Sequence, residues 1–143
     1  MSNNSTIESK EVKKFAKYAN QWWNDKGSFA PLHKFNPVRI KFFTEHLAFN
    51  FAKNKNIKLL DIGCGGGLVS ESLATLGYEV TGIDVVAENI ITAKNHAKFN
   101  NLNITYLNQS IEEHLKSHTR HYDVVICSEV IDHIKNPKVF LHY

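Results

Sequence analysis

Apolar residues in the first third of the chain recur at the spacing of an amphipathic helix. From Glu11 they fall three or four positions apart as far as the tryptophan pair at 22–23, which predicts one helix with a buried face. Gly27 and Pro31 interrupt this pattern and predict a loop. Asn36 followed by Pro37 is typical of a helix cap with proline at the first helical position, so we expect a second helix to begin there.

The pattern changes after residue 57, where short apolar runs alternate with segments of helical spacing. The runs predict buried parallel strands at 58–62, 78–84, 104–107 and 122–127. The segments between them predict helices at 68–76, 87–99 and 111–116. Gly77 closes the first of these as a C-cap. This alternation predicts an α/β fold with a parallel sheet and right-handed crossovers.

Composition and charge narrow the class of protein. The two cysteines, Cys64 and Cys127, lie far apart without metal-ligand spacing, which argues against a disulfide scaffold and predicts a reducing, cytoplasmic setting. Residues 1–58 hold 11 Lys or Arg against 4 Asp or Glu, whereas residues 59–143 hold 6 against 10. The basic part fits an anionic lipid surface, an acidic partner or simply lysines that solvate helix faces. No basic run has interleaved aromatic residues, so no nucleic-acid partner is expected.

A glycine-rich turn directly follows the first predicted strand. Its spacing is Asp-x-Gly-x-Gly-x-Gly, formed by Asp61, Gly63, Gly65 and Gly67. Glycines let the backbone turn sharply and approach a ligand closely. A dinucleotide loop of the form G-x-G-x-x-G would need glycine at position 68, where the chain has Leu68. The Asp61 carboxylate would repel a pyrophosphate but suits the ammonium group of S-adenosylmethionine, which the loop therefore predicts as cofactor.

Polar residues at the ends of the next two strands complete this prediction. Asp84 ends the second strand, where an acid binds ribose hydroxyls in such folds. Gln109 and Ser110 follow the third strand, where the adenine should reach, and either could bond its amino group. Ser110 with Glu113 equally predicts a helix capping box, and both roles can hold together.

The fourth strand is followed by two acids and a histidine. If the chain turns helical there, Glu129, Asp132 and His133 share one face. Such a set suits magnesium or manganese better than structural zinc, and a bound Mg²⁺ would lower the pKa of a substrate hydroxyl. His133 alone could instead act as general base, and the plain alternative is a surface helix start with acids near its positive end.

These residues match a known family: the chain resembles the ubiquinone-biosynthesis O-methyltransferases, which methylate polyprenyl catechols and demethylubiquinol. The similarity runs from about Val12 to the end. Its most specific part is N-terminal, with Trp22-Trp23-Asn24, Gly27, Phe29, Leu32-His33 and Asn36-Pro37-Val38-Arg39. A second stretch is Cys64-Gly65-Gly66-Gly67 followed by Ser70-Glu71-Ser72. A last stretch is Glu129-x-x-Asp132-His133, where the family usually has Glu-x-x-Glu-His.

The resemblance implies a Rossmann-like class I S-adenosylmethionine-dependent methyltransferase fold with two N-terminal helices. Since this family uses seven strands, the chain is expected to be truncated after the fourth parallel strand. The implied cofactor contacts are Arg39, Gly63, Asp84 and Ser128, and the implied metal ligands are Glu129, Asp132 and His133. Arg39 makes physical sense because a guanidinium can clamp the methionine carboxylate with two bonds.

Three parts are therefore expected: a flexible tail at 1–10, two helices with a lid-like loop at 11–57, and a cofactor-binding half domain at 58–143. The expected activity is O-methylation of catechol or quinol intermediates of ubiquinone biosynthesis. The alternative is a non-catalytic remnant, or a cofactor-binding half that needs a partner chain. Expected partners are a polyprenyl substrate and a peripheral contact with the inner face of the membrane or with a ubiquinone-biosynthesis complex.

Overall fold

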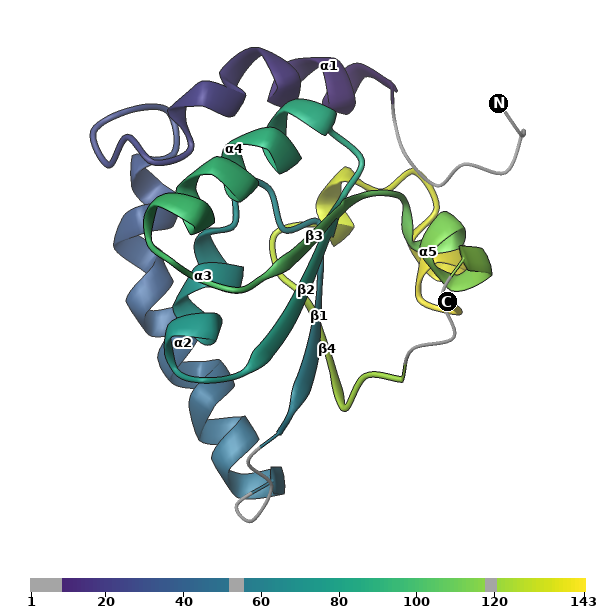
Figure 1. The fold of residues 1–143 in the computed structure, drawn as a ribbon. Coiled ribbons are helices and arrows are strands. Elements are labelled where there is room, and N and C mark those ends of the chain that lie inside the picture. The colour runs from purple at the N-terminus through teal and green to yellow at the C-terminus, as the bar shows by residue number, and fades with distance from the viewer. Residues whose placement is uncertain (1–8, 52–55, 118–120) are drawn as a thin grey trace.

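A parallel four-stranded sheet forms the centre of the molecule. The structure is a computed structural model that describes residues 9–51, 56–117 and 121–143, so most of the predicted tail at 1–10 lies outside the described residues. The strands are β1 (Lys58–Ile62), β2 (Glu79–Asp84), β3 (Thr105–Asn108) and β4 (Val124–Cys127). They lie in the order β3-β2-β1-β4, and every pairing is parallel. The carboxyl ends of all four strands therefore meet at one edge of the sheet (Figure 1).

Each of the first three strands leads into a helix, as the sequence predicts. These helices are α3 (Leu68–Thr75), α4 (Ala87–Phe99) and α5 (Ile111–Ser117). Gly77 takes a φ of 95° and its N–H donates to the Ala74 carbonyl, which confirms the predicted C-cap of α3. The Rossmann-like alternation of strand and helix is confirmed.

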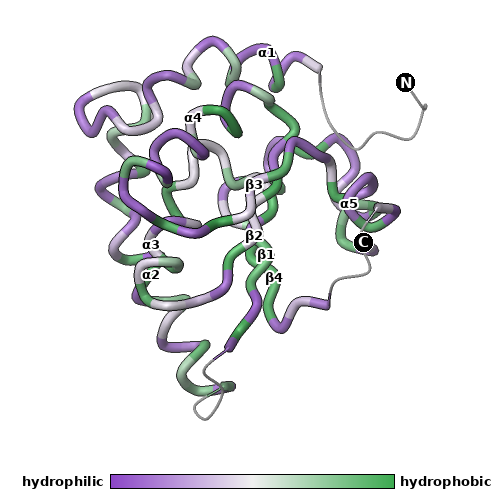
Figure 2. Tube along the Cα trace, viewed as in Figure 1, coloured by the Kyte–Doolittle hydropathy of each residue, from purple (hydrophilic) through white to green (hydrophobic). Residues whose placement is uncertain are grey.

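Neighbouring leucines of β1 point to opposite faces of the sheet and build two cores. Leu59 packs with Leu47 and Leu73 on the face covered by α2 and α3. Leu60 packs on the other face with residues that include Ile111 and Phe140. Hydrophobic colouring accordingly runs along the strands in Figure 2. Because both faces are covered, the strands read as continuous apolar runs rather than alternating ones.

The N-terminal part packs over the helices rather than joining the sheet. It consists of α1 (Ser9–Tyr18), the short 3₁₀ helix η1 (Ala19–Gln21) and the long helix α2 (Ala30–Phe51). Figure 1 shows α1 across the top of α4 and α2 along the side of the sheet, next to α3. The first predicted helix is thus present, but its last turn is the 3₁₀ helix η1, which ends before the tryptophan pair at 22–23.

The predicted start of the second helix is wrong. The helix α2 begins at Ala30, and Pro37 lies inside it. Asn36 does not cap a helix: its side chain is buried and donates to the Leu68 carbonyl at 3.5 Å and to Ser72 Oγ at 3.0 Å. A proline in a helix interior costs about 3 kcal/mol. The contacts of Asn36 with α3 outweigh that local cost. These contacts join residues more than 30 positions apart, so the local sequence pattern does not predict them.

The segment after β4 is short and irregular. It contains the 3₁₀ helix η2 (Ile131–His133) and the one-turn helix α6 (Pro137–Phe140), which Asn136 caps by accepting from the Val139 N–H. Among the described residues, no helix has both the length and the apolar character needed to cross a membrane. Cys64 is buried and Cys127 partly buried, and both are free cysteines.

Candidate active site

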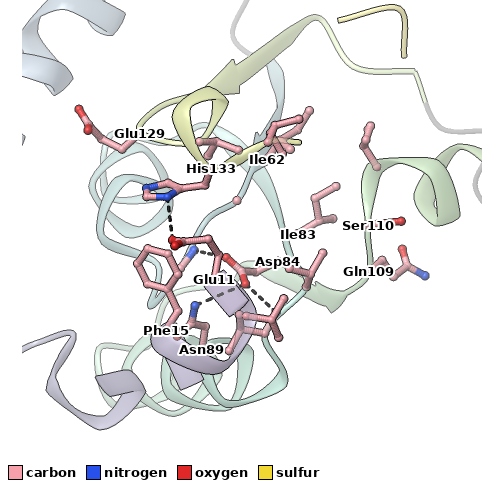
Figure 3. A pocket seen from close by; sticks show the side chains of 18 of the residues that line it. Glu11, Phe15, Ile62, Ile83, Asp84, Asn89, Gln109, Ser110, Glu129 and His133 are labelled. Atoms are coloured by element: carbon pink, nitrogen blue, oxygen red, sulfur yellow. Dashed lines mark hydrogen bonds and ion pairs between the residues drawn. The ribbon is translucent and has the colours of Figure 1, made fainter. Parts of the chain in front are cut away.

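Two adjoining cavities open at the edge where the parallel strands end. The first lies among the ends of β1 and β2, the start of α5, the segment after β4, and α1 (Figure 3). The second lies between the glycine loop, α2 and the same segment after β4. Trp22, Gly63, Glu129 and His133 line both cavities. In open α/β sheets this edge is where ligands bind.

The glycine loop joins β1 to α3 in a conformation that favours glycine. Gly63, Gly65 and Gly67 take φ values of 69°, 54° and 90°. A Cβ added at Gly65 would lie 2.4 Å from the ring of Trp22. Sequence reasoning assigned these glycines to close approach of a ligand. The structure adds a second reason, which is that an indole packs directly against the loop.

Asp84 is held in a fixed orientation at the end of β2. Its Oδ2 accepts from the Gly65 N–H at 2.9 Å, and its Oδ1 accepts from the Val86 N–H at 2.8 Å and from Asn89 Nδ2 at 3.4 Å. The side chain is buried yet lines the first cavity. Burial raises the pKa of this carboxyl, while the three donors oppose that rise. The arrangement fixes the carboxyl group of Asp84 beside the glycine loop, and its contact with a ribose stays a prediction.

Asp61 lies deeper, at the second cavity. Its side chain is buried, and Oδ2 accepts from Ser70 Oγ at 2.6 Å. Burial raises the pKa of Asp61 to about 6, and the Ser70 hydrogen bond opposes this. A carboxyl with this pKa changes its charge near physiological pH, so its ionisation can respond to a cation bound nearby.

Arg39 extends from α2 towards Asp61 in the same cavity. Its Nη2 donates to Asn36 Oδ1 at 3.1 Å and to the Leu32 carbonyl at 3.4 Å, and its Nη1 donates to Ser128 Oγ at 3.5 Å. Arg39 Nε is buried, and no described group accepts from it. A buried donor without a partner costs about 1–3 kcal/mol, so it favours a ligand that supplies an acceptor.

The residues predicted near adenine line the first cavity, but their side chains already have partners. Ser110 and Glu113 form the reciprocal capping box of α5: Ser110 N–H donates to Glu113 Oε2 at 2.8 Å, and Glu113 N–H donates to Ser110 Oγ at 3.2 Å. The Gln109 side chain bonds His114 at 3.1 Å and Ser117 at 3.4 Å. The capping box is therefore confirmed, and the adenine contact stays a prediction.

The condition for the predicted metal site, a helix directly after β4, is not met. Glu129 takes a φ of 58°, and only Ile131–His133 form a short 3₁₀ turn. Glu129 therefore shares no helical face with Asp132 and His133. No three His, Cys, Asp or Glu side chains come together as a metal-binding group within residues 9–51, 56–117 and 121–143.

Both ring nitrogens of His133 face carboxylates instead. Nδ1 lies 2.9 Å from Glu11 Oε2, and Nε2 lies 3.3 Å from Asp132 Oδ2. Figure 3 shows Glu11 reaching from α1 across the first cavity to His133, beside the edge of the Phe15 ring. Sequence reasoning missed Glu11. The available signal was its position one helical turn before Phe15, on the side of α1 that faces the site.

The tryptophan pair anchors the N-terminal part on the glycine loop. Trp22 is buried and stacks on Phe29 with ring centroids 4.0 Å apart. Trp23 donates to the Gly66 carbonyl at 3.0 Å and stacks on His96 at 3.5 Å. His96 Nδ1 lies 2.9 Å from both carboxylate oxygens of the buried Glu71. The tryptophans thus connect the loop to α3 and α4.

The parallel sheet, the glycine loop after β1 and the acid that ends β2 define the class: a Rossmann-like methyltransferase fold. The chain belongs to the methyltransferase domain family, whose model matches residues 60–142.

Comparison with known proteins agrees with the resemblance seen in the sequence. The chain is 43% identical over 137 residues to the ubiquinone biosynthesis O-methyltransferase of Rickettsia felis, covering 96% of this chain and 55% of that protein. It is 40% identical over 136 residues to the protein of that name from Salmonella typhi, covering 95% of this chain and 54% of the relative. The chain therefore spans about half the length of the curated relatives it matches.

Solved structures share the fold. The plantazolicin methyltransferase BpumL, crystallised with a monoazolic desmethylPZN analog and SAH, has a TM-score of 0.63 at 24% identity, over 93% of this chain and 53% of that one. The magnesium protoporphyrin IX methyltransferase ChlM of Synechocystis PCC 6803, with bound SAM, has a TM-score of 0.65 at 20% identity, over 92% and 66%. At these identities the likeness shows the fold alone.

Proposed function

We propose that the two cavities bind S-adenosylmethionine and that the chain supplies the cofactor-binding part of an O-methyltransferase. The observation that carries this proposal is the pairing of a fixed carboxylate, Asp84, with a second cavity that combines Asp61 and the open Nε of Arg39. A ligand that joins a nucleoside to an amino acid needs an acceptor for its ribose hydroxyls, an anion for its ammonium group and a cation for its carboxylate. A dinucleotide would instead place phosphates beside Asp61.

The groups of the cofactor follow from the charges. Asp84 would accept from the two ribose hydroxyls, as an acid at this strand end does in related folds. Asp61 would face the ammonium group, and Arg39 with Ser128 would bind the carboxylate through a charge-assisted pair. The adenine would lie against the start of α5, beside Ser110. When bound, the cofactor supplies an electrophilic methyl group on its sulfonium.

The chain's own part in the chemistry is to orient a hydroxyl and to accept its proton. His133 lines both cavities, and the rings of Phe15 and Trp22 lie along the same walls. These apolar walls suit an aromatic substrate ring. For His133 to act as base through Nε2, Asp132 must release that nitrogen, and the Asp132 side chain is 67% exposed and able to turn away.

The proposal extends to the substrate class and to a contact with a membrane surface. We infer a catechol or quinol intermediate of ubiquinone biosynthesis because the relatives carry that name. A peripheral membrane contact is supported by the excess of basic residues in 1–58. Cosedimentation of the chain with anionic and with neutral vesicles tests this contact. Equal partition into both would contradict an electrostatic attachment.

The magnesium set at Glu129, Asp132 and His133 stays a prediction of the sequence. The described geometry does not bring the three side chains together, so no step is assigned to a metal ion. Titration with Mg²⁺ in the presence and absence of a catechol tests it directly. Saturable binding that Glu129→Gln removes would support the site, and no heat in either titration would contradict it.

Calorimetric titration of the chain with S-adenosylhomocysteine tests the core of the proposal. We expect saturable binding with one site, which Asp84→Ala abolishes because the ribose hydroxyls lose their acceptor. NADH serves as the control ligand, and binding of NADH in place of S-adenosylhomocysteine would contradict the assignment. The exposed Asp25→Ala is the matched control for loss of a carboxylate.

A further inference from the structure

The side chain of Trp22 forms one end of a buried hydrogen-bond relay that ends on Asp84. Its Nε1–H donates to Asn89 Oδ1 at 2.8 Å, across 67 residues of sequence. Asn89 Nδ2 in turn donates to Asp84 Oδ1 at 3.4 Å. Figure 3 shows Asn89 and Asp84 side by side at the first cavity. Trp22 therefore connects to the acid that we assign to the ribose.

The chemistry of the three groups fixes the direction of this relay. An indole N–H only donates, so Asn89 must turn its carbonyl oxygen to Trp22. The amide nitrogen then faces Asp84, which as a carboxylate only accepts. Asn89 is 2% exposed, so its amide is shielded from bulk solvent in the folded chain. Without the indole donor, the amide loses the contact that decides which way it faces.

An amide turned the other way would affect the acid directly. Its oxygen would then lie near Asp84 Oδ1, where two acceptors repel. Asp84 would keep the Gly65 and Val86 N–H donors but lose the one side-chain donor that it has among the described residues. A carboxylate that binds two neighbouring hydroxyls depends on its orientation, because each oxygen serves one hydroxyl.

We propose that Trp22 is a positioning residue for ribose recognition, acting through Asn89 on the carboxylate of Asp84. This proposal rests on the proposed function, since it assumes that Asp84 binds the ribose. Trp22 is held for this role by stacking on Phe29 and by packing against Gly65 and Gly66. Through this relay the N-terminal part, which packs on the glycine loop, also contributes to recognition of the ribose hydroxyls.

The experiment compares two ligands on the full chain. Wild type and Trp22→Phe are titrated with S-adenosylhomocysteine and with its 2′,3′-dideoxy analogue. Phenylalanine keeps a ring to stack on Phe29 but removes the N–H donor. We expect the affinity for S-adenosylhomocysteine to fall about tenfold, as for loss of one buried hydrogen bond. The affinity for the dideoxy analogue should change by less than about twofold, because that ligand has no hydroxyl for Asp84 to bind.

Trp23→Phe is the matched control, since it removes the neighbouring indole N–H, which bonds the Gly66 carbonyl. It should leave the ratio of the two affinities as in wild type. Asn89→Ala should lower the ratio as Trp22→Phe does, and the double variant should be no worse than either single variant. If Trp22→Phe fails to fold by circular dichroism, Asn89→Ala carries the same comparison.

Equal losses for both ligands in Trp22→Phe and Asn89→Ala would overturn the relay and leave Trp22 a packing role. Absence of S-adenosylhomocysteine binding in wild type would overturn the proposed function itself. The two failures are thus distinguishable.

Discussion

The glycine loop with Asp84 and the segment after β4 line the same cavities, yet they are built differently. The loop and Asp84 are buried and held by backbone N–H donors and an indole. The segment after β4 contains only the 3₁₀ turn η2 and the one-turn helix α6, and its His133 contacts Glu11 and the mostly exposed Asp132. The glycine loop and Asp84, which we assign to the cofactor, are therefore held by buried contacts of the fold. The position of His133, which we assign to the chemistry, depends on partly exposed side chains.

This difference predicts that changes in the loop alter both stability and cofactor binding, whereas a change at the exposed Asp132 leaves cofactor binding intact. Four variants test that contrast, from the largest expected effect to the smallest.

The largest effect is expected from Gly65→Ala. Its Cβ would lie 2.4 Å from the Trp22 ring at a φ of 54°, so the indole must move off the loop. We expect the free energy of unfolding to fall by about 3 kcal/mol and S-adenosylhomocysteine binding to be lost, as for overpacking in a core. Urea unfolding and calorimetry measure the two effects.

Gly77→Ala is the control for this variant. Gly77 has a φ of 95° but nothing within 4 Å of an added Cβ. It should therefore cost only the backbone strain, about 1 kcal/mol, and leave binding unchanged. Equal effects of the two substitutions would show that backbone strain, and not the indole, makes the loop sensitive.

The sequence predicts the loop side well because its signals are local. Apolar runs, the glycine spacing and Asp84 identify β1, α3, β2 and α4 to within a few residues. It does not predict the Trp22–Asn89 bond, because the partners are 67 residues apart and neither residue type requires the other. It fails at Asn36, where buried contacts with α3 favour a helix that already begins at Ala30. It also fails at Glu129, whose backbone takes a φ of 58° instead of a helical value.

The second largest effect is expected from Asp61→Asn. The pKa of Asp61 is about 6 in the folded chain and ordinarily 3.8, so the folded state binds the proton more tightly. The stability from this protonated carboxyl is fully present below pH 4 and is lost as the pH rises through 6. Asp61→Asn should therefore raise the free energy of unfolding at pH 7.5 by about 2 kcal/mol and flatten its decline between pH 4 and 6.

The same variant should weaken S-adenosylhomocysteine about tenfold, because the ammonium group loses its anionic partner. Urea unfolding at pH 4, 6 and 7.5 and calorimetry at pH 7.5 provide the measurements. The exposed Asp25→Asn is the control. A variant that becomes less stable at pH 7.5 would show that the Ser70 hydrogen bond outweighs the burial of charge.

A smaller effect is expected from Glu71→Ala, which tests whether the contact of Glu71 with His96, on which Trp23 stacks, stabilises the glycine loop. Glu71 is buried, and burial raises its pKa, while its bond to His96 opposes the rise. Removing it takes away the carboxylate beneath the Trp23–His96 stack. We expect a loss of about 1–2 kcal/mol, reduced from that of a fully buried pair because His96 is partly exposed.

Affinity for S-adenosylhomocysteine should fall only about threefold in this variant, since Glu71 does not line either cavity. Glu88→Ala, on the exposed side of α4, is the matched control. A loss of binding as complete as that of Gly65→Ala would mean that the stack of Trp23 on His96 positions the loop itself.

The smallest effect is expected from Asp132→Asn, on the other side of the comparison. The Asp132 side chain is 67% exposed and lies 3.3 Å from His133 Nε2, and exposed pairs contribute about 0–1 kcal/mol. Stability should therefore change by less than about 0.5 kcal/mol and S-adenosylhomocysteine affinity by less than about twofold. If the affinity instead falls tenfold, Asp132 would belong to the cofactor site together with Ser128, and the contrast between the glycine loop and Asp132 would not hold. A silent Asp132→Asn beside a damaging Gly65→Ala would show that cofactor binding depends on the glycine loop and not on the charge of Asp132.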